Sequence, residues 1–349
     1  MKYLLGFIAV LLHVHMLCGQ ETRLASGLKC AVNNITTEIR FVNINTVRIF
    51  KYQGTGTPAK HSLTVLDNKK ETVHTTVSET DDTWAIRSAG IKVTLDKHDG
   101  IVSFFDNNGL RLLAEEKDGQ PFRKIDDSVT HVSQSFAVGP DEAVYGLGQH
   151  QNGKMNQRNQ TILLRQRNMD IAVPFLQSTK GYGVYWDNYS ATIYTSYADS
   201  INLSSEAGNC IDYYFIAGKN ADAVIDGYRK LTGTVPMFPL WSYGYIQSRE
   251  RYQSQEQVVD VVRRYRQLHV PIDAVVQDWQ YWGTDNKNWN AARFDNPRYA
   301  DPVAMIDSVH AMHAKIMISV WPSFGSRSAI YKELDAKKML FGFTTFPET

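Results

Sequence analysis

The 349-residue sequence predicts a multidomain chain, an antiparallel β-sandwich followed by the first part, about three βα units, of a (β/α)8 TIM barrel. The first half of the chain consists of many short runs that alternate apolar and polar residues and are broken by turn residues. The second half alternates strand-like with helix-like patterns. A segment punctuated by prolines, 232–239, separates the two. We therefore expect a sandwich over residues 20–236 and an incomplete barrel over residues 237–349.

The predicted sandwich rests on strand and turn signals. Residues 46–52 and 91–96 alternate apolar with polar side chains, which is typical of half-buried strands. Asp99-Gly100 lies between two such runs and predicts a hairpin. A last strand is expected over 212–217, and residues 220–231 carry apolar residues at helical spacing.

Three strands are expected in the second half. Residues 240–247 are the first, 272–277 the second and 315–321 the third. The second is a continuous apolar run, as expected for a strand covered on both faces. A doubly wound sheet is the alternative, but no glycine-rich phosphate loop follows any of these strands.

Two helix starts separate the strands. Ser254, with Gln257 three residues later, has the pattern of a capping box. Asp301-Pro302 places a capping carboxylate before a proline in the first turn. Helix therefore follows each of the first two strands, as a barrel requires.

Composition and the amino terminus restrict the class of protein. The chain is 43% hydrophobic and 21% charged with a net charge of +1, so nothing in the charge indicates a nucleic-acid partner. Residues 1–19 carry Lys2 and then an apolar run too short to cross a bilayer, which predicts a signal peptide. We expect an exported protein, periplasmic or secreted, with no membrane span; a lipid anchor on Cys18 is the alternative.

The sequence indicates no metal or cofactor. His310 and His313 lie three residues apart on a predicted helix, but no third ligand is in view. Cys30 and Cys210 could pair in an exported protein, yet two buried thiols are the simpler expectation. Arg249 and Arg251 could bind anions, but Glu250 lies between them and we expect both to be solvated.

The candidate binding residues follow the second and third strands. Asp278 and Trp279 end the second strand, and Trp321 ends the third. In a barrel, the carboxyl ends of the strands carry the active site. An ionised aspartate accepts hydrogen bonds through two oxygens, which suits neighbouring sugar hydroxyls. A structural role for Asp278, bonded to backbone, is the alternative.

Further aromatic residues crowd the loop after the second strand. Their flat faces could stack on a sugar ring, or they could pack only against the loop itself. For Tyr281, Trp282 and Trp289 the two interpretations are equally supported.

Taken together, these segments resemble glycoside hydrolase family 31, the α-glucosidase and α-xylosidase family. In the first half the resemblance rests on Tyr145-Gly-Leu-Gly-Gln-His-Gln, Ala172-Val-Pro-Phe and Gly181-Tyr-Gly-Val-Tyr-Trp-Asp-Asn. In the second half it rests on Pro239-Leu-Trp-Ser-Tyr-Gly-Tyr-Ile-Gln-Ser-Arg, Pro271-Ile-Asp-Ala-Val-Val-Gln-Asp-Trp, Phe294-Asp-Asn-Pro and Trp321-Pro. Two further segments are most similar to secreted bacterial α-xylosidases that act on xyloglucan: Gln277-Asp-Trp-Gln-Tyr-Trp-Gly and Tyr331-Lys-Glu-Leu-Asp-Ala-Lys-Lys.

The resemblance implies a retaining, exo-acting α-glycosidase that removes terminal α-xylosyl or α-glucosyl residues from oligosaccharides, xyloglucan fragments among them. It implies two catalytic aspartates on later strands, beyond Thr349, so we expect this chain to be an amino-terminal portion that is inactive alone. It also implies that Asp278, Trp279 and Trp321 line the subsite of the sugar being cleaved. A loop of the sandwich within 152–170 is expected to reach toward that site, with no residue assigned. The alternative is a non-catalytic carbohydrate-binding protein or an inactive fragment.

Overall fold

The computed structural model describes residues 21–341 except 55, 67–72, 118–119, 284, 290–291 and 322. The predicted signal peptide, with Cys18, lies outside the described residues. The chain forms two compact units, one up to Val235 and one from Pro236.

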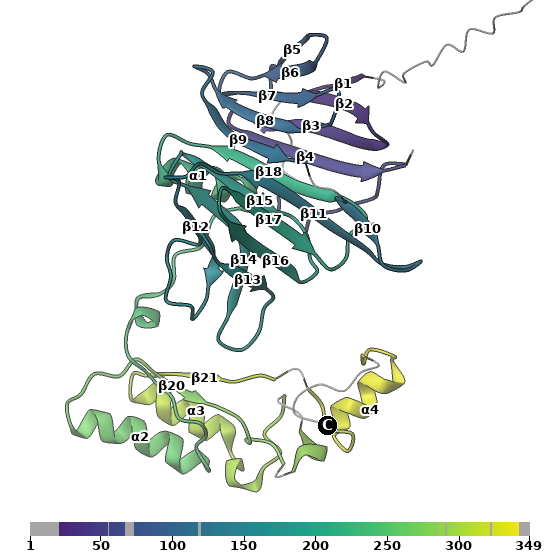
Figure 1. Ribbon diagram of the computed structural model, residues 1–349. Coiled ribbons are helices and arrows are strands. Elements are labelled where there is room, and N and C mark those ends of the chain that lie inside the picture. Colours follow the sequence, from purple (N-terminus) through teal and green to yellow (C-terminus); the bar gives the residue numbers. More distant parts are fainter. Residues whose placement is uncertain are drawn as a thin grey trace, which may run out of the picture. The chain divides into compact units, whose positions relative to one another are not determined.

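The first unit contains two antiparallel sheets that face each other (Figure 1). The eight-stranded sheet has the order β1 (Thr22–Leu24), β2 (Gly27–Val32), β3 (Ile35–Asn43), β4 (Thr46–Gln53), β18 (Ile211–Ala217), β15 (Tyr182–Trp186), β14 (Ile171–Ser178), β12 (Val144–Gln149). The ten-stranded sheet has the order β13 (Thr161–Leu164), β16 (Thr192–Tyr197), β17 (Ser200–Ser205), β11 (Thr130–Ala137), β9 (Arg111–Glu116), β8 (Val102–Asp106), β7 (Ile91–Asp96), β6 (Thr83–Arg87), β5 (Thr76–Glu79), and β10 (Phe122–Lys124) pairs with β11. The sandwich predicted from the alternating runs is confirmed.

A hydrophobic core lies between the two sheets. Phe104 on β8 stacks on Phe215 on β18, with the ring centroids 4.1 Å apart. Phe136 on β11 meets Tyr213 on β18 edge to face, at 5.2 Å. Aromatic contacts of this kind add to the free energy of burying the rings. The predicted hairpin is also present, because β7 pairs with β8 and Gly100 takes the positive φ of 76° that its turn requires.

Helix α1 (Ala221–Thr232) covers part of the eight-stranded sheet. The side chain of Asn220 caps its first turn by accepting the N–H of Ala223. Val224 and Leu231 are buried in a cluster with aromatic residues of that sheet. Phe175 of β14 stacks on Tyr228 at 4.2 Å, which fixes the helix to the sheet.

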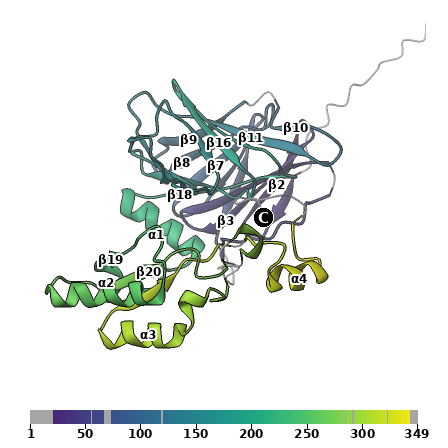
Figure 2. The same cartoon turned by 90° about the horizontal axis from the view of Figure 1, so that it is seen from below.

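The second unit is built around a three-stranded parallel sheet with the order β19 (Ile246–Gln247), β20 (Ala274–Gln277), β21 (Lys315–Ile318). Helices α2 (Gln255–Gln267) and α3 (Pro302–Ala311) connect the strands, and α4 (Ala329–Ala336) follows β21 (Figure 2). Short 3-10 helices are η1 (Leu240–Tyr243), η2 (Asn286–Asn288) and η3 (Pro297–Tyr299). The sheet and its crossing helices are the first part of a TIM barrel, as predicted.

Both predicted helix starts are present. Asp301 accepts the N–H of Ala304 and caps α3, with Pro302 as its first residue. Ser254 accepts the N–H of Gln257 and caps α2. The side chain of Gln257 returns to the N–H of Gln253, one residue before the position that a capping box uses.

The predicted strand over 240–247 is wrong for most of its length. Residues 240–243 form η1, which begins after Pro239, and Ser242 Oγ donates to the carbonyl of that proline at 2.7 Å. The N–H of Gly244 donates to the carbonyl of Trp241. Because these polar groups are satisfied locally, only Ile246 and Gln247 pair with β20. The third strand likewise ends at Ile318, three residues before Trp321.

Two further expectations concern membranes and thiols. No helix within the described residues has the length and apolarity to cross a bilayer. Cys30 and Cys210 are buried and unpaired, as expected. Burial raises the pKa of the Cys30 thiol to about 12 and that of Cys210 to about 11, which keeps both in the unreactive thiol form at neutral pH.

Candidate functional site

The parallel pairing of β20 and β21 brings the predicted site residues to one edge of the sheet. Gln277 pairs with Ile318, and the N–H of Ser319 donates to the carbonyl of Gln277 at 3.0 Å. The carboxyl ends of β20 and β21 therefore lie side by side at one edge of the sheet. Asp278 and Trp279 follow the first of these strand ends directly, and Trp321 lies three residues beyond the second.

The carboxylate of Asp278 is half-buried and only partly engaged. Its Oδ1 accepts the N–H of the next residue, Trp279, at 2.9 Å. Its Oδ2 accepts no hydrogen bond from any residue between 21 and 341 that the structure describes. Since an ionised carboxylate can accept about four hydrogen bonds, Asp278 retains acceptor capacity for a ligand.

A buried glutamine holds the end of β20 in place. Gln277 is fully buried, and its Nε2 donates to the carbonyl of Asp278 at 3.2 Å. Its Oε1 accepts the hydroxyl of Tyr299 at 3.1 Å. These bonds fix the backbone that carries Asp278 while leaving the carboxylate itself available.

A cluster of indoles connects the two strand ends. Trp289 stacks on Trp279 with centroids 5.6 Å apart and an interplanar angle of 22°. The same ring packs edge-on against Trp321 at 5.6 Å and 66°. Trp279 and Trp321 are partly buried, whereas Trp289 is 5% exposed. Trp289 thus packs against both candidate residues.

The other loop aromatics are also buried. Trp282 and Tyr281 are 0% and 1% exposed. The Tyr281 hydroxyl donates to the carbonyl of Ser319 at 3.0 Å, which ties the loop after β20 to the end of β21. Burial raises the pKa of Tyr281 to about 12, so the hydroxyl stays a donor. For Tyr281, Trp282 and Trp289 the packing interpretation therefore holds, and direct stacking on a ligand does not.

Arg251 was not expected at this site. Its guanidinium lies 5.1 Å from the centroid of the Trp279 ring and donates to the Gln280 side chain. The expected solvation holds for exposed Arg249 but is wrong for Arg251. Gln280 has a φ of 63°, in the left-handed region that non-glycine residues seldom adopt. An arginine three residues before the Ser254 cap of α2 carries little sequence signal, so only the fold reveals its contact with Trp279.

Two further features concern metal ligands and the sandwich segment 152–170. No group of three or more His, Cys, Asp or Glu side chains in the described part of the chain could hold a metal ion. The segment 152–170 contains β13, and Asp170 at its end pairs with Arg167. His150 Nδ1 lies 3.6 Å from Asp170 Oδ1.

Comparisons with known proteins agree with the two units. A family model described as the glycosyl hydrolase 31 N-terminal galactose mutarotase-like domain matches residues 36–194. A second, the glycosyl hydrolases family 31 TIM-barrel domain, matches residues 235–345.

Individual relatives extend over both units. The chain is 37% identical to an α-xylosidase of Saccharolobus solfataricus over 325 residues, which cover 90% of this chain and 44% of that protein. It is 26% identical to α-glucosidase 2 of Bacillus thermoamyloliquefaciens, covering 82% of this chain and 37% of the relative. The crystal structure of the family 31 α-xylosidase from Xanthomonas citri matches with a TM-score of 0.81 and 26% identity, over 90% of this chain and 51% of that one. The chain spans about half the length, or less, of the relatives it matches. By these matches, it belongs to glycosyl hydrolase family 31, of which it carries the N-terminal mutarotase-like domain and the first part of the TIM barrel.

Proposed function

We propose that the protein to which this chain belongs is a retaining α-glycosidase that releases terminal α-xylosyl or α-glucosyl residues from oligosaccharides, including fragments of xyloglucan. The observation that carries the proposal is the Asp278 carboxylate, held at the end of β20 with an unused oxygen beside a partly buried indole. The relative with 37% identity is an α-xylosidase, which favours xylosyl over glucosyl substrates.

In this proposal the residues of the chain bind and orient the sugar. Asp278 accepts hydrogen bonds from ring hydroxyls, while Trp279 and Trp321 present apolar faces to the C–H groups of the pyranose. A bulky indole next to the carboxylate also leaves less room for the exocyclic CH2OH that distinguishes glucose from xylose. Trp279 is therefore our candidate for the residue that sets sugar preference.

Bond cleavage is assigned to no residue of this chain. A retaining mechanism uses two carboxyl groups about 5–5.5 Å apart, one as nucleophile and one as acid and then base. By the family resemblance, we expect both on later strands of the barrel. The contribution of Asp278 is to hold the sugar so that its anomeric carbon faces them, and correct positioning of this kind lowers the barrier to reaction.

The test is Asp278→Asn in the protein at its natural length, assayed on aryl α-xyloside and aryl α-glucoside. Loss of a charged acceptor costs about 1.5–3 kcal/mol, so kcat/KM is expected to fall by about 10- to 100-fold. Asp301→Asn is the matched control, because Asp301 is exposed and asparagine caps a helix as well as aspartate does. A near wild-type kcat/KM for Asp278→Asn would remove this residue from the site. Faster hydrolysis of the glucoside than of the xyloside would reverse the proposed preference.

Export is part of the same proposal. The signal-like pattern of residues 1–19 supports a periplasmic or secreted protein. Amino-terminal sequencing of the mature protein should begin near Gln20. A mature protein that begins at Met1 would contradict export by this route.

A further inference from the structure

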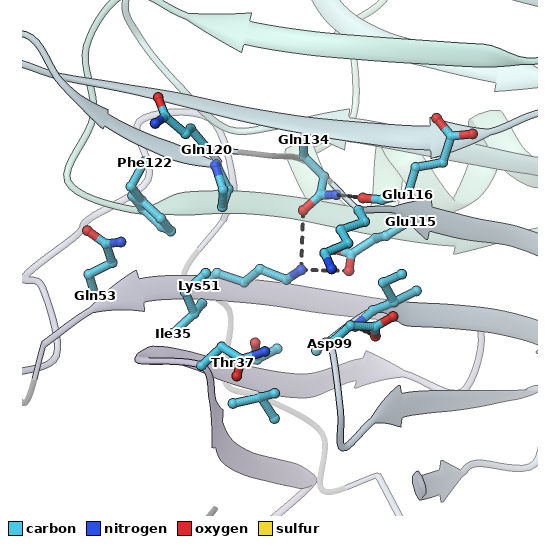
Figure 3. A pocket seen from close by; sticks show the side chains of 16 residues that line it. Ile35, Thr37, Lys51, Gln53, Asp99, Glu115, Glu116, Gln120, Phe122 and Gln134 are labelled. Carbon is cyan, nitrogen blue, oxygen red and sulfur yellow. Dashed lines mark hydrogen bonds and ion pairs between the residues drawn. The ribbon is translucent and has the colours of Figure 1, made fainter. Parts of the chain in front are cut away.

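The sandwich unit contains a cavity of about 330 Å³ that is separate from the strand ends of the parallel sheet. It opens between the two sheets, with β2–β4 on one side and β9–β11 on the other (Figure 3). This volume is at the lower end of the range for small-molecule sites, ~300–1,000 Å³. Its polar lining and its size make it a candidate for binding a small hydrophilic molecule.

A buried ammonium group forms part of the lining. Lys51 Nζ donates to Glu115 Oε2 at 2.6 Å and to Gln134 Oε1 at 3.2 Å, joining the two sheets (Figure 3). Glu115 also accepts the N–H of Val102 and the hydroxyl of Tyr213, each at 2.7 Å. Lys51, Glu115 and Gln134 are all at most 7% exposed.

The cluster of Lys51, Glu115 and Gln134 leaves one hydrogen-bond donor of Lys51 without an acceptor among the described residues. Glu115 accepts hydrogen bonds from three donors, through both of its oxygens. Lys51 has three N–H groups, and its contacts within the described residues use two of them. A buried donor without a partner costs free energy, so a ligand or solvent oxygen in the cavity is favoured.

The walls combine an aromatic face with neutral polar groups. Phe122 is half-buried and faces the cavity together with the amide of Gln53 and the side chain of Thr37 (Figure 3). The Thr37 hydroxyl makes no hydrogen bond to any residue in the described ranges. Pro121 and Ile35 complete an apolar side.

The charge of the lining disfavours an anionic ligand. Lys51 is already paired with Glu115, and the other charged residues in the lining are Asp99, Glu116 and Lys117. Carboxylates thus outnumber ammonium groups. A phosphate or a carboxylated ligand would meet net repulsion, because like charges at short range raise the free energy of the complex.

We propose that this cavity binds one neutral pyranose unit, at a site distinct from Asp278 and without a part in cleavage. Hydroxyls of the ring accept from Lys51 and exchange hydrogen bonds with Gln53 and Thr37, while the C–H face of the ring packs on Phe122. A small pocket with one aromatic wall and neutral donors and acceptors suits an uncharged polyhydroxylated ring better than a charged or fully apolar ligand.

The test is saturation-transfer NMR with methyl α-D-xylopyranoside, methyl α-D-glucopyranoside and sodium D-glucuronate. The protein carries Asp278→Asn throughout, which weakens sugar binding at the barrel edge, and the cavity variants below separate any binding that remains there from binding in the cavity. We expect saturation transfer to at least one of the two neutral glycosides and none to glucuronate. Failure of the cleavage proposal would appear in the hydrolysis assay and would leave this measurement unaffected.

Phe122→Leu and Gln53→Ala, added to the same background, are each expected to weaken binding by about tenfold, which is the effect of losing roughly one aromatic or amide contact. Phe105→Leu is the matched control, because Phe105 is a half-buried phenylalanine of β8 that does not line the cavity. Thermal unfolding checks that each variant is folded.

Three results would overturn the proposal. Absence of transfer to both neutral glycosides would show that the cavity holds solvent only. Equal binding by Phe122→Leu, Gln53→Ala and Phe105→Leu would place the sugar elsewhere. Preferential binding of glucuronate would show an anion site. Lys51→Met would leave Glu115 buried without its cation, so its effect on folding would mask its effect on binding.

Discussion

Two aspartates, one in each unit, have opposite environments. Asp212 belongs to β18 and is 1% exposed. Its two oxygens accept from Arg48 Nε and Nη2 at 2.8 and 2.6 Å, and Lys60 Nζ lies 3.0 Å away. Asp278 follows β20 and is half-buried, and its carboxylate accepts only the N–H of Trp279 among the described residues.

The position in the strand explains the difference. Within β18 and β4, Asp212 is paired with Phe50 and Arg48 with Tyr214, so Asp212 and Arg48 are diagonal neighbours on one face of the sheet. A carboxylate inside an antiparallel sheet can thus meet a cation from the next strand. Past the end of a parallel strand no neighbouring residue of the ladder is available, so the carboxylate of Asp278 stays accessible. The paired carboxylate of Asp212 thus stabilises the fold, whereas the accessible carboxylate of Asp278 can bind a ligand.

Removal of the partner cation is expected to have the largest effect. Arg48→Met leaves Asp212 buried with Lys60 alone, and breaking a buried ion pair from one side costs about 3 kcal/mol or more. The midpoint of chemical denaturation, followed by circular dichroism, should fall clearly. Arg87→Met, at the exposed end of β6, is the control and should change little. An unchanged midpoint for Arg48→Met would mean that Asp212 does not depend on this pair.

A smaller effect is expected from substituting Arg251, which contacts Trp279, the residue after Asp278. Arg251 lies over the Trp279 ring, and a cation–π contact of this kind contributes about 1 kcal/mol. If Arg251 positions Trp279, Arg251→Met in the natural-length protein should raise KM for the aryl α-xyloside by about fivefold and leave the denaturation midpoint nearly unchanged.

Arg249→Met is the control, because Arg249 is exposed on the same loop. Arg251→Lys keeps the charge without the planar group and should restore only part of the affinity. A loss confined to the denaturation midpoint, with KM unchanged, would make Arg251 a structural residue only.

Much of this architecture could be predicted from local patterns. Alternating runs and Asp99-Gly100 are short-range signals, and the sandwich with its β7–β8 hairpin followed from them. The caps at Ser254 and Asp301 are likewise decided by residues within one turn. Asp278 and Trp321 were expected at one sheet edge because parallel strands have the same direction, and the register of β20 with β21 agrees.

The remaining features depend on contacts between distant residues. The contact of Arg251 with Trp279 requires β19 and β20 to be neighbours in space, which spacing along the chain does not reveal. The apolar residues of 240–247 predict a strand. Its first four residues instead form η1 after Pro239, where Ser242 donates a hydrogen bond to the carbonyl of that proline. The Lys51–Glu115 pair joins residues from two sheets and has no short-range signature.

A third aspartate extends the comparison and predicts the smallest effect. Asp187 is 1% exposed, and neither of its carboxylate oxygens has a hydrogen-bond donor among the described residues. Burial raises its pKa above the ordinary value of 3.8; Lys60, 3.6 Å away, opposes the shift, and the carboxylate of Asp212 adds to it. Folding therefore favours the protonated acid.

Because the folded-state pKa is the higher one, the contribution of Asp187 to stability is fully present below its ordinary, unfolded-state pKa of 3.8. It is lost as the pH rises through the folded-state value. Asp187→Asn cannot ionise, so the stability of this variant relative to the wild type should increase as the pH is raised from 4 and then level off. The change should be smaller than that for Arg48→Met, since Lys60 already offsets part of the cost of burying the charge. Asp226→Asn, at an exposed position of α1, should give a difference that hardly varies over the same range. If the stability difference between Asp187→Asn and the wild type does not vary with pH, then solvent or Lys60 fully compensates the buried carboxylate. Asp187 would then be a satisfied charge of the sandwich, as Asp212 is.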